Sequence, residues 1–201
     1  MTKKQDLRIR RTKKALNTSL LSLMGRQHFS EITIQDLADE AIINRATFYL
    51  HYYDKYDLLE TCIQDNMNHI MLKHIEPIQH IRDGILYTNV FEKIITEILK
   101  SVETNESFFL IMFQSDCDKQ MKDYLVTLGN EKIVPQIEGI FKKGLSERYK
   151  DITLQLIVST VLGIISWWLS SEEKEEPEEI AQLIVGVVTR GPAYTIGLEI
   201  D

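Results

Sequence analysis

The sequence predicts an all-α protein, and three observations support this fold class. Only 9 glycines and 4 prolines interrupt the 201 residues, whereas an all-β fold needs turn residues at short, regular intervals. Hydrophobic residues make up 44% and charged residues 26% of the chain, which is a globular composition and excludes a disordered protein. Apolar residues also recur at helical spacing along most of the chain. We therefore expect about nine helices and no strand.

Two helices are expected at the start of the chain. Apolar positions three and four residues apart predict the first helix over residues 7–27. Thr33 is followed three residues later by Asp36, a pattern like a capping box, in which the hydroxyl accepts a backbone N–H that lacks an intrahelical partner. We expect the second helix to begin there and to end near Glu40.

A short third helix completes a helix-turn-helix arrangement. Asn44 is a favourable N-cap, and the helix is expected to run from Arg45 to His51. A turn of about three or four residues separates it from the preceding helix, which is the spacing of a helix-turn-helix motif, here at about residues 31–50. Residues 1–55 are therefore predicted to form an N-terminal three-helix domain.

Residues 56–201 are predicted to form a helical bundle. A long helix should run from Lys55 to about His80, with Asp54 as its N-cap and Pro77 as a kink or an end. Helical spacing predicts the other helices at about residues 89–103, 106–115, 119–147 with a bend at Pro135, 151–171 and 178–190.

Charge is distributed unevenly along the chain. The net charge is −7, yet residues 1–30 hold eight Lys and Arg against one acid, and residues 58–201 carry a net −10. A basic end on an acidic protein indicates that this end meets a polyanion, although a solvated basic helix face is the alternative.

Several kinds of chemistry are excluded by the motifs. Cys62 and Cys117 form no pair or cluster, so we expect reduced thiols in a cytoplasmic protein and neither a disulfide scaffold nor a zinc site. The chain has no nucleophile elbow, phosphate-binding loop or zinc-protease motif. His69, His74 and His80 are five and six residues apart, which does not stack them as metal ligands on one helix face. We expect no enzyme activity, no catalytic residues, no metal and no cofactor.

Residues 29–59 read FSEITIQDLADEAIINRATFYLHYYDKYDLL, and this segment resembles the TetR family of transcriptional regulators. The family pattern has a Thr-initiated helix with an I-x-x-I/L-A-x-x-A core, then a short helix reading roughly S-x-G-T-[FL]-Y-x-[HY]-F, then K-x-x-L-L. The matching residues are Thr33, Ile34, Leu37, Ala38, Ala41, Thr47, Phe48, Tyr49, His51, Tyr52, Lys55, Leu58 and Leu59. Ala46 stands where the family has Gly, and Asn44 replaces the usual Ser.

The third helix is suited to DNA. A helix of seven residues is about 10 Å long, and the major groove is about 12 Å wide. Arg45 could pair with a guanine, and Tyr49 and Lys55 resemble the family's phosphate-contacting positions. The expected contacts with double-stranded DNA are Thr33, Arg45, Ala46, Thr47, Tyr49, His51 and Lys55. Packing of Tyr49 and simple solvation of Arg45 or His51 are the alternatives.

A second surface is expected near the C-terminus. Residues 152–169 are apolar nearly all round and long enough to be weighed as a membrane span, but polar residues interrupt them and no second such segment exists. We expect a second subunit to cover this helix, as in the four-helix dimer interface of the family, and no membrane contact. The expected interface residues are Val161, Ile165, Trp168, Ile180, Leu183, Ile184 and Val187. An intrachain core pair is the alternative.

The middle of the chain is rich in aromatic residues and Met. Many relatives hold an effector in this bundle, and an apolar lining suits a small hydrophobic molecule. The candidate lining residues are Phe109, Phe113, Tyr124 and Trp167; an ordinary packed core is the alternative. The resemblance thus implies a cytoplasmic homodimeric repressor that binds a near-palindromic operator and is released by such an effector. The alternative is a protein-interaction module or co-activator of the same fold without an effector.

Overall fold

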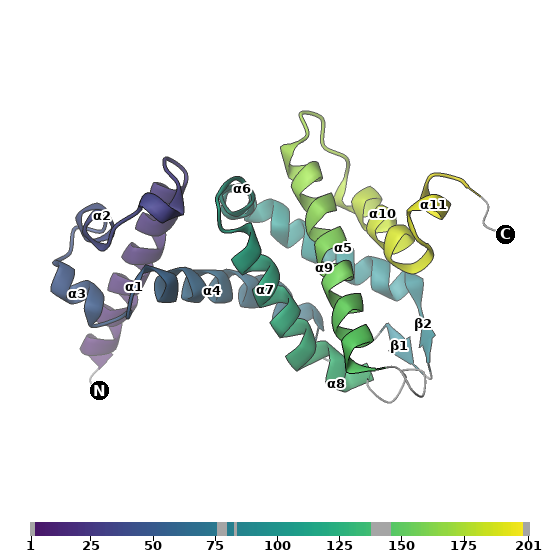
Figure 1. Cartoon of the computed structure of the whole chain (residues 1–201), viewed down its shortest axis with the longest axis horizontal. Helices are drawn as coiled ribbons and strands as arrows, with labels where there is room; N and C mark the ends of the chain where they lie inside the picture. The colour runs from purple at the N-terminus through teal and green to yellow at the C-terminus, as the bar shows by residue number, and fades with distance from the viewer. Residues whose placement is uncertain (1–2, 76–79, 83, 138–145, 199–201) are drawn as a thin grey trace. The chain divides into compact units, whose positions relative to one another are not determined.

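The structure is a computed structural model that describes residues 3–75, 80–82, 84–137 and 146–198, which are helical apart from loops and one short hairpin (Figure 1). The predicted all-α fold class is confirmed. The N-terminal helices are α1 (Lys3–Met24), the 3₁₀-helix η1 (Phe29–Glu31), α2 (Ile34–Glu40), α3 (Arg45–Tyr49) and α4 (Lys55–Ile75). The helices that follow are α5 (Thr88–Thr104), α6 (Glu106–Gln114), α7 (Asp118–Leu128), α8 (Val134–Ile137), α9 (Glu147–Ser170), α10 (Pro177–Arg190) and α11 (Pro192–Thr195).

The chain forms two compact units. Unit 1 comprises Met1–Met67 together with Ile111–Met121, and unit 2 comprises Asn68–Leu110 and Lys122–Asp201. Helices α4, α6 and α7 therefore each pass from one unit into the other. The functional division at residue 55 that the sequence suggested stays a prediction, because compactness does not by itself assign function.

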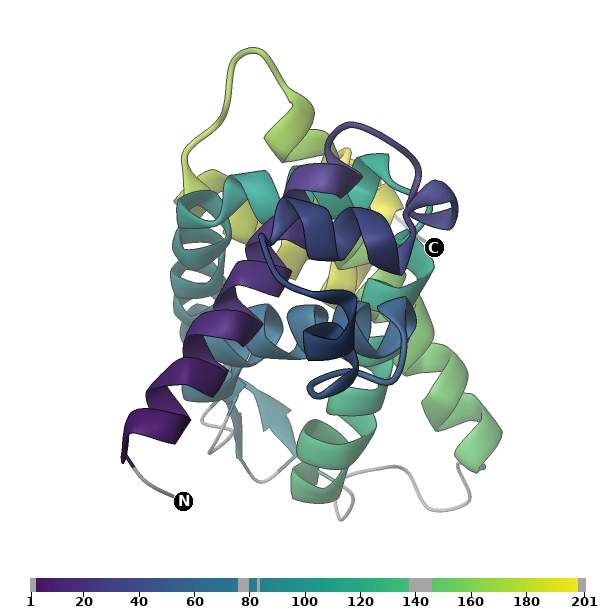
Figure 2. The same ribbon diagram turned by 90° about the vertical axis from the view of Figure 1, so that its left-hand side faces the viewer.

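Unit 1 is built around α1. Helix α1 packs against α2, and α2 packs against α3 (Figure 2). Fully buried apolar side chains fill the interior, and each contributes about 1.5–3 kcal/mol relative to an exposed one. The segment Ile111–Met121 adds three of them, so part of the core of unit 1 comes from the middle of the chain. Its buried members include Leu16, Leu20, Leu37, Phe48, Leu58, Cys62, Met112, Cys117 and Met121.

Side-chain caps set the starts of the short helices, as the sequence predicted. The Thr33 hydroxyl accepts the Asp36 N–H at 3.1 Å, and Asp36 Oδ2 accepts the Thr33 N–H at 2.8 Å, which forms a capping box. Asn44 Oδ1 accepts the Ala46 N–H at 2.7 Å. Asp54 Oδ1 accepts two N–H groups of the first turn of α4. Helix α3 ends at Tyr49, two residues earlier than expected.

A short hairpin corrects the expectation that the chain has no strand. Strand β1 (Ile81–Arg82) pairs antiparallel with β2 (Ile85–Leu86), and Gly84 in the turn between them has a φ of +76°. Positive φ is readily adopted by glycine. Two residues a strand are too few for an alternating pattern, so periodicity could not reveal them. Pro77, where a kink was expected, lies outside the described residues.

The helix expected over residues 119–147 departs from regular α-helix before Pro135, where a bend was expected. Helix α7 continues into a π-helical turn over Gly129–Ile133 and then into α8. A Cβ on Gly129 would lie 2.9 Å from both Cδ atoms of Leu154, so the missing side chain lets α9 approach this turn. Residues 138–145, at the end of the expected helix, lie outside the described part of the chain.

Unit 2 centres on α10, which packs against α5, α9 and α11 (Figure 1). Its buried side chains include Leu99, Val102, Phe109, Trp168, Ile180 and Ile184. Helix α11 lies in the C-terminal tail, for which the residues supported no prediction.

Candidate functional site

Helix α3 presents a polar face to solvent. Phe48 is buried in unit 1, whereas Arg45, Ala46 and Tyr49 are exposed. Arg45 Nη2 donates to Tyr49 Oη at 3.3 Å, and the guanidinium carbon lies 5.7 Å from the centre of that ring. The two side chains thus share one face one turn apart, as i, i+4 neighbours do. Thr47, another expected contact, is only partly exposed.

The basic helix α1 reaches the end of α3. The Lys13 ammonium lies 5.6 Å from the centre of the Tyr52 ring. Burial and the charge of Lys13 lower the pKa of His51 from its usual 6.5. Other basic residues of α1, including Arg10, Arg11 and Lys14, are exposed. Unit 1 therefore places positive charge from α1 beside the exposed end of the helix-turn-helix, which attracts a polyanion.

The Thr33 hydroxyl, an expected DNA contact, is already hydrogen-bonded within the chain. Its hydroxyl donates to Asp36 Oδ2 at 2.7 Å while it accepts the Asp36 N–H. The hydrogen bonds from the Thr33 side chain and backbone lower the pKa of Asp36. The hydroxyl has a single proton, so Thr33 can donate to a phosphate only if this bond breaks.

The geometry argues against the expected phosphate contact of Lys55. Its Nζ donates to three carbonyl oxygens, those of Phe29 at 2.8 Å, Ser30 at 2.9 Å and Ile32 at 2.8 Å. An ammonium has three donors, and all three are used. The ammonium also lies 4.8 Å from the centre of the Phe29 ring. Lys55 therefore fixes the segment that leads into α2, a role that sequence reasoning missed.

The turn of the helix-turn-helix contains an unusual residue. Ile42 has a φ of +54°, and its side chain is 93% exposed. A β-branched residue in the left-handed region carries a strain of about 1–2 kcal/mol, and an exposed side chain gains almost nothing from packing. The turn between α2 and α3 therefore holds Ile42 in a backbone conformation that isoleucine disfavours.

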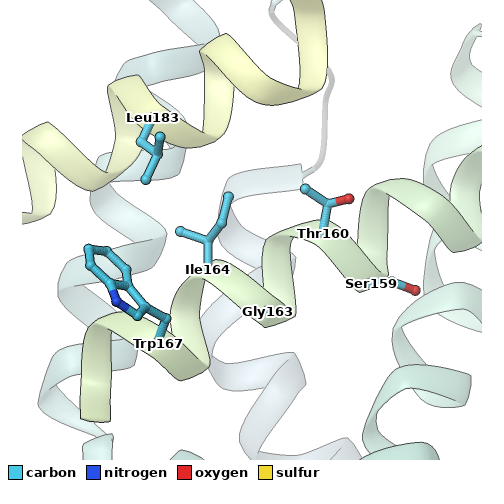
Figure 3. A pocket seen from close by; sticks show the side chains of 6 residues that line it. All are labelled: Ser159, Thr160, Gly163, Ile164, Trp167 and Leu183. Carbon is cyan, nitrogen blue, oxygen red and sulfur yellow. The ribbon is translucent and has the colours of Figure 1, made fainter. Parts of the chain in front are cut away.

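A pocket of about 410 Å³ lies on the outer side of α9, between that helix and α10 (Figure 3). Its lining residues are Ser159, Thr160, Gly163, Ile164, Trp167 and Leu183. Trp167 is 51% exposed there, whereas its neighbour Trp168 is fully buried and donates its indole N–H to the Glu175 carbonyl at 2.9 Å. Trp168 was expected at the subunit interface and Trp167 in the effector lining; the structure buries Trp168 within unit 2 and leaves Trp167 half-exposed.

The other expected interface residues fall into two groups. Ile165, Ile180 and Ile184 are buried within unit 2, so they belong to the core of the chain and are not available to a partner. Val161, Leu183 and Val187 remain partly exposed. Helices that are apolar on several sides give no sequence signal for which side faces inward, which is why the assignment mixed the two.

Helix α9 is long and apolar enough to cross a membrane, and it is the one such helix in the described part of the chain. Its most apolar window of 18 residues has a mean hydropathy of 1.8, and only 17% of that window is buried within the chain. A single helix of this kind is weak evidence for a membrane span. Its exposed apolar side chains are of the kind that marks interaction surfaces.

Of the expected effector-lining residues, Phe109 and Phe113 lie one turn apart on α6, Tyr124 comes from α7, and Trp167 comes from α9. Phe109 is buried in unit 2, and Tyr124 of the same unit donates its hydroxyl to Asn68 Oδ1 at 2.8 Å. Phe113 belongs to unit 1, and Trp167 lines the surface pocket on α9. The structure thus does not bring Trp167 into the lining proposed for it.

Both cysteines are free and buried. Burial raises the pKa of the Cys62 thiol to about 12 and that of Cys117 to about 11. Neither forms a thiolate near neutral pH, so neither can serve as a nucleophile.

Two family models match the chain. Residues 20–62 match the family described as bacterial regulatory proteins, tetR family, and residues 89–190 match the family described as transcriptional regulator C-terminal region. The first match contains the whole helix-turn-helix, and the second spans α5 to α10.

A curated relative is the uncharacterized HTH-type transcriptional regulator YxbF of Bacillus subtilis, which is 40% identical over 182 residues. The match includes 88% of this chain, but the chain spans only 44% of the length of that relative.

Solved structures of similar fold include a TetR transcriptional regulator from Streptococcus agalactiae. It shares 26% identity with a TM-score of 0.66, over 92% of this chain and 98% of that one. The transcriptional regulator FadR from Bacillus subtilis, solved in complex with stearoyl-CoA, shares the fold with a TM-score of 0.60 at 12% identity, over 89% of this chain and 98% of that one.

Proposed function

Because the chain belongs to the TetR family of transcriptional regulators, we propose that it is a cytoplasmic homodimeric repressor that binds a near-palindromic operator through α3. The observation that carries the proposal is the exposed face of α3, which bears Arg45 and Tyr49. Lys13 of α1 adds a positive charge next to Tyr52, three residues after the end of α3. Arg at the start of a recognition helix can form two hydrogen bonds with a guanine. Tyr49, His51 and Lys13 are then placed for phosphates.

The dimer part of the proposal rests on α9 and α10. Trp167, Ile164 and Leu183 line an apolar pocket that a second copy would fill. Gly163 supports this reading, because a Cβ there would meet nothing within 4 Å in the chain, although glycine weakens a helix interior by about 0.5–1 kcal/mol relative to alanine. Close approach by a partner helix would explain its presence. Two recognition helices about 34–36 Å apart would then read successive major grooves.

The effector part of the proposal rests on the interior of unit 2, where Tyr124 and Asn68 form a polar pair and Phe109 and Trp168 are buried. A ligand acts only through its different affinity for the DNA-binding and the released arrangement. Acyl-CoA thioesters are suitable first compounds, since the Bacillus subtilis FadR holds one, although its likeness to this chain extends to the fold alone. Trp167→Phe leaves Trp168 as the reporter of binding, and the decisive result is a compound that changes both its fluorescence and the affinity for DNA.

Base readout is tested with duplexes selected from a random pool by the wild-type protein. Arg45→Ala should cost about 1–3 kcal/mol on the selected duplex and much less on a mixed-sequence duplex. Lys14→Ala is the matched control, because it removes an exposed positive charge from α1 and should weaken both complexes equally. Equal losses for Arg45→Ala on the two duplexes would refute its role as a base contact. If the wild type selects no duplex at all, the protein-interaction alternative is preferred.

A further inference from the structure

The 3₁₀-helix η1 is held at both of its ends by charged side chains. At its N-terminal side, Asp116 Oδ1 accepts the Phe29 N–H at 3.0 Å and Asp116 Oδ2 accepts the Ser30 N–H at 3.3 Å. On its carbonyl side, Lys55 donates to three oxygens of the same segment. A carboxylate at the N–H end and an ammonium at the carbonyl end both have the sign that the peptide dipoles favour.

Asp116 comes from a distant part of the sequence. It lies between α6 and α7, in the segment Ile111–Met121 that packs into unit 1. Met112 and Cys117 of this segment are fully buried in that unit, so they anchor the backbone on both sides of the exposed carboxylate. Burial raises the pKa of Asp116, but hydrogen bonds from the Phe29, Ser30 and Asp116 backbone outweigh it and the net shift is downward. The carboxylate is therefore ionised at neutral pH.

The position of η1 controls the start of the helix-turn-helix. Ile32 follows it directly and is buried, and Thr33 then caps α2. Helix α2 has seven residues and α3 has five, which is far below the length at which a helix is stable alone. Their orientation must come from their attachments, and η1 is the attachment at the N-terminal end of the motif.

We propose that Asp116 is a positioning residue for the DNA-binding surface, because it holds η1, to which the start of α2 is attached. The inference rests on the proposed function. The segment Ile111–Met121 thereby gives the N-terminal motif a support from the middle of the chain.

The test uses the full-length protein with the selected and mixed-sequence duplexes. Asp116→Asn keeps the shape of the side chain but sets an amide NH₂ group against one of the two N–H donors. We expect it to bind both duplexes about tenfold more weakly with their affinity ratio unchanged, and the peptide covering residues 27–33 to exchange its amide hydrogens about tenfold faster. Asp116→Glu, which keeps the carboxylate, should recover part of both losses.

Asp118→Asn is the matched control. It removes the same charge two residues further on, while the N–H groups of η1 are already donated to Asp116 and, from Glu31, to the His28 carbonyl. We expect it to stay within about twofold of the wild type. Stoichiometric titration well below the melting temperature shows that each variant is fully folded, so that a loss of affinity is not a loss of active protein.

The outcomes separate this inference from the proposed function. Wild-type binding to DNA together with an Asp116→Asn variant that binds within twofold, or unchanged hydrogen exchange at residues 27–33, would overturn the positioning role alone. A wild type that retains no duplex would overturn the proposed function and, with it, the role of Asp116 in DNA binding.

Discussion

The helix-turn-helix of unit 1 and the α9–α10 face of unit 2 differ in what holds and covers them. In unit 1, hydrogen bonds from side chains of the chain itself hold each short element, as Thr33, Asn44 and Lys55 show. The exposed face of α3 is then polar and ready to meet a polyanion. On α9, by contrast, Leu156 and Trp167 stand exposed beside an apolar pocket, so this face remains partly uncovered within the chain. The first surface is built from contacts within the chain, and for the second we propose that another copy of the chain supplies the cover.

The largest expected effect is on the apolar face of α9 and α10, and it concerns dimer formation. Leu183→Lys sets an ammonium into the apolar pocket beside Trp167, where a partner would bury it unpaired. We expect the dimer to dissociate at least about a hundredfold more readily, or by about 2.7 kcal/mol, as measured by sedimentation at micromolar concentration.

The matched control for this change is Gln182→Lys. Gln182 is exposed on the neighbouring position of α10, and its amide faces Glu92 Oε1 at 3.4 Å, so the added charge gains an acidic neighbour outside the pocket. This variant should dimerise like the wild type. A wild-type protein that is monomeric under these conditions would contradict the proposed interface.

The second effect, within unit 1, distinguishes a structural role of Lys55 from a phosphate contact. Lys55→Met keeps most of the aliphatic stem but leaves three carbonyl oxygens without their donor. We expect the free energy of unfolding to fall by about 1–3 kcal/mol in urea titrations, and the slope of DNA affinity against salt to stay unchanged. A phosphate contact would instead reduce that slope by about one. Lys14→Met, on the exposed face of α1, should show the reverse pattern.

Local and long-range features differ in how much of them the sequence revealed. Caps depend on residues two or three positions apart, so Thr33, Asn44 and Asp54 predicted the starts of α2, α3 and α4. The periodicity of apolar residues likewise predicted the helical fold. These are short-range signals, and one sequence contains them in full.

The missed features depend on long-range contacts. The carbonyls that Lys55 binds lie more than twenty residues earlier, and Asp116 lies more than eighty residues after η1, so no local pattern links them. Periodicity did not distinguish the buried Trp168 from the exposed Trp167, because α9 is apolar on several sides and only its packing against α10 shows which side is inward. The match of Lys55 to a family position identified an important residue but suggested a role that the geometry disfavours.

A smaller effect is expected in the turn between α2 and α3. Ile42→Gly should relieve the strain of the positive φ at this exposed position, which is about 1–2 kcal/mol. The greater freedom of glycine in the unfolded chain offsets about 0.5–1 kcal/mol of this gain. We therefore expect a net stabilisation of about 0.5–1 kcal/mol, seen as a higher melting temperature. Ile43→Gly, one residue further on, is expected to destabilise, and equal effects at the two positions would show that backbone strain is not the cause.

The smallest expected effect tests whether His51, near the end of α3, binds DNA together with the positive charge of α1. Burial and Lys13 place the pKa of His51 in the folded chain below its unfolded value of 6.5. The contribution of neutral His51 to the free energy of unfolding is therefore fully present above pH 6.5, and it is lost as the pH falls through the folded pKa. It should be small, because the side chain is partly solvated. If His51 contacts a phosphate, DNA raises its pKa again, so that binding takes up a proton and the affinity increases between pH 7 and pH 5.5. His51→Gln should remove this increase, while His28→Gln, at an exposed position of the same unit, should keep it. An increase that survives in His51→Gln would mean that His51 lies outside the contact and that the charge of α1 alone provides the attraction.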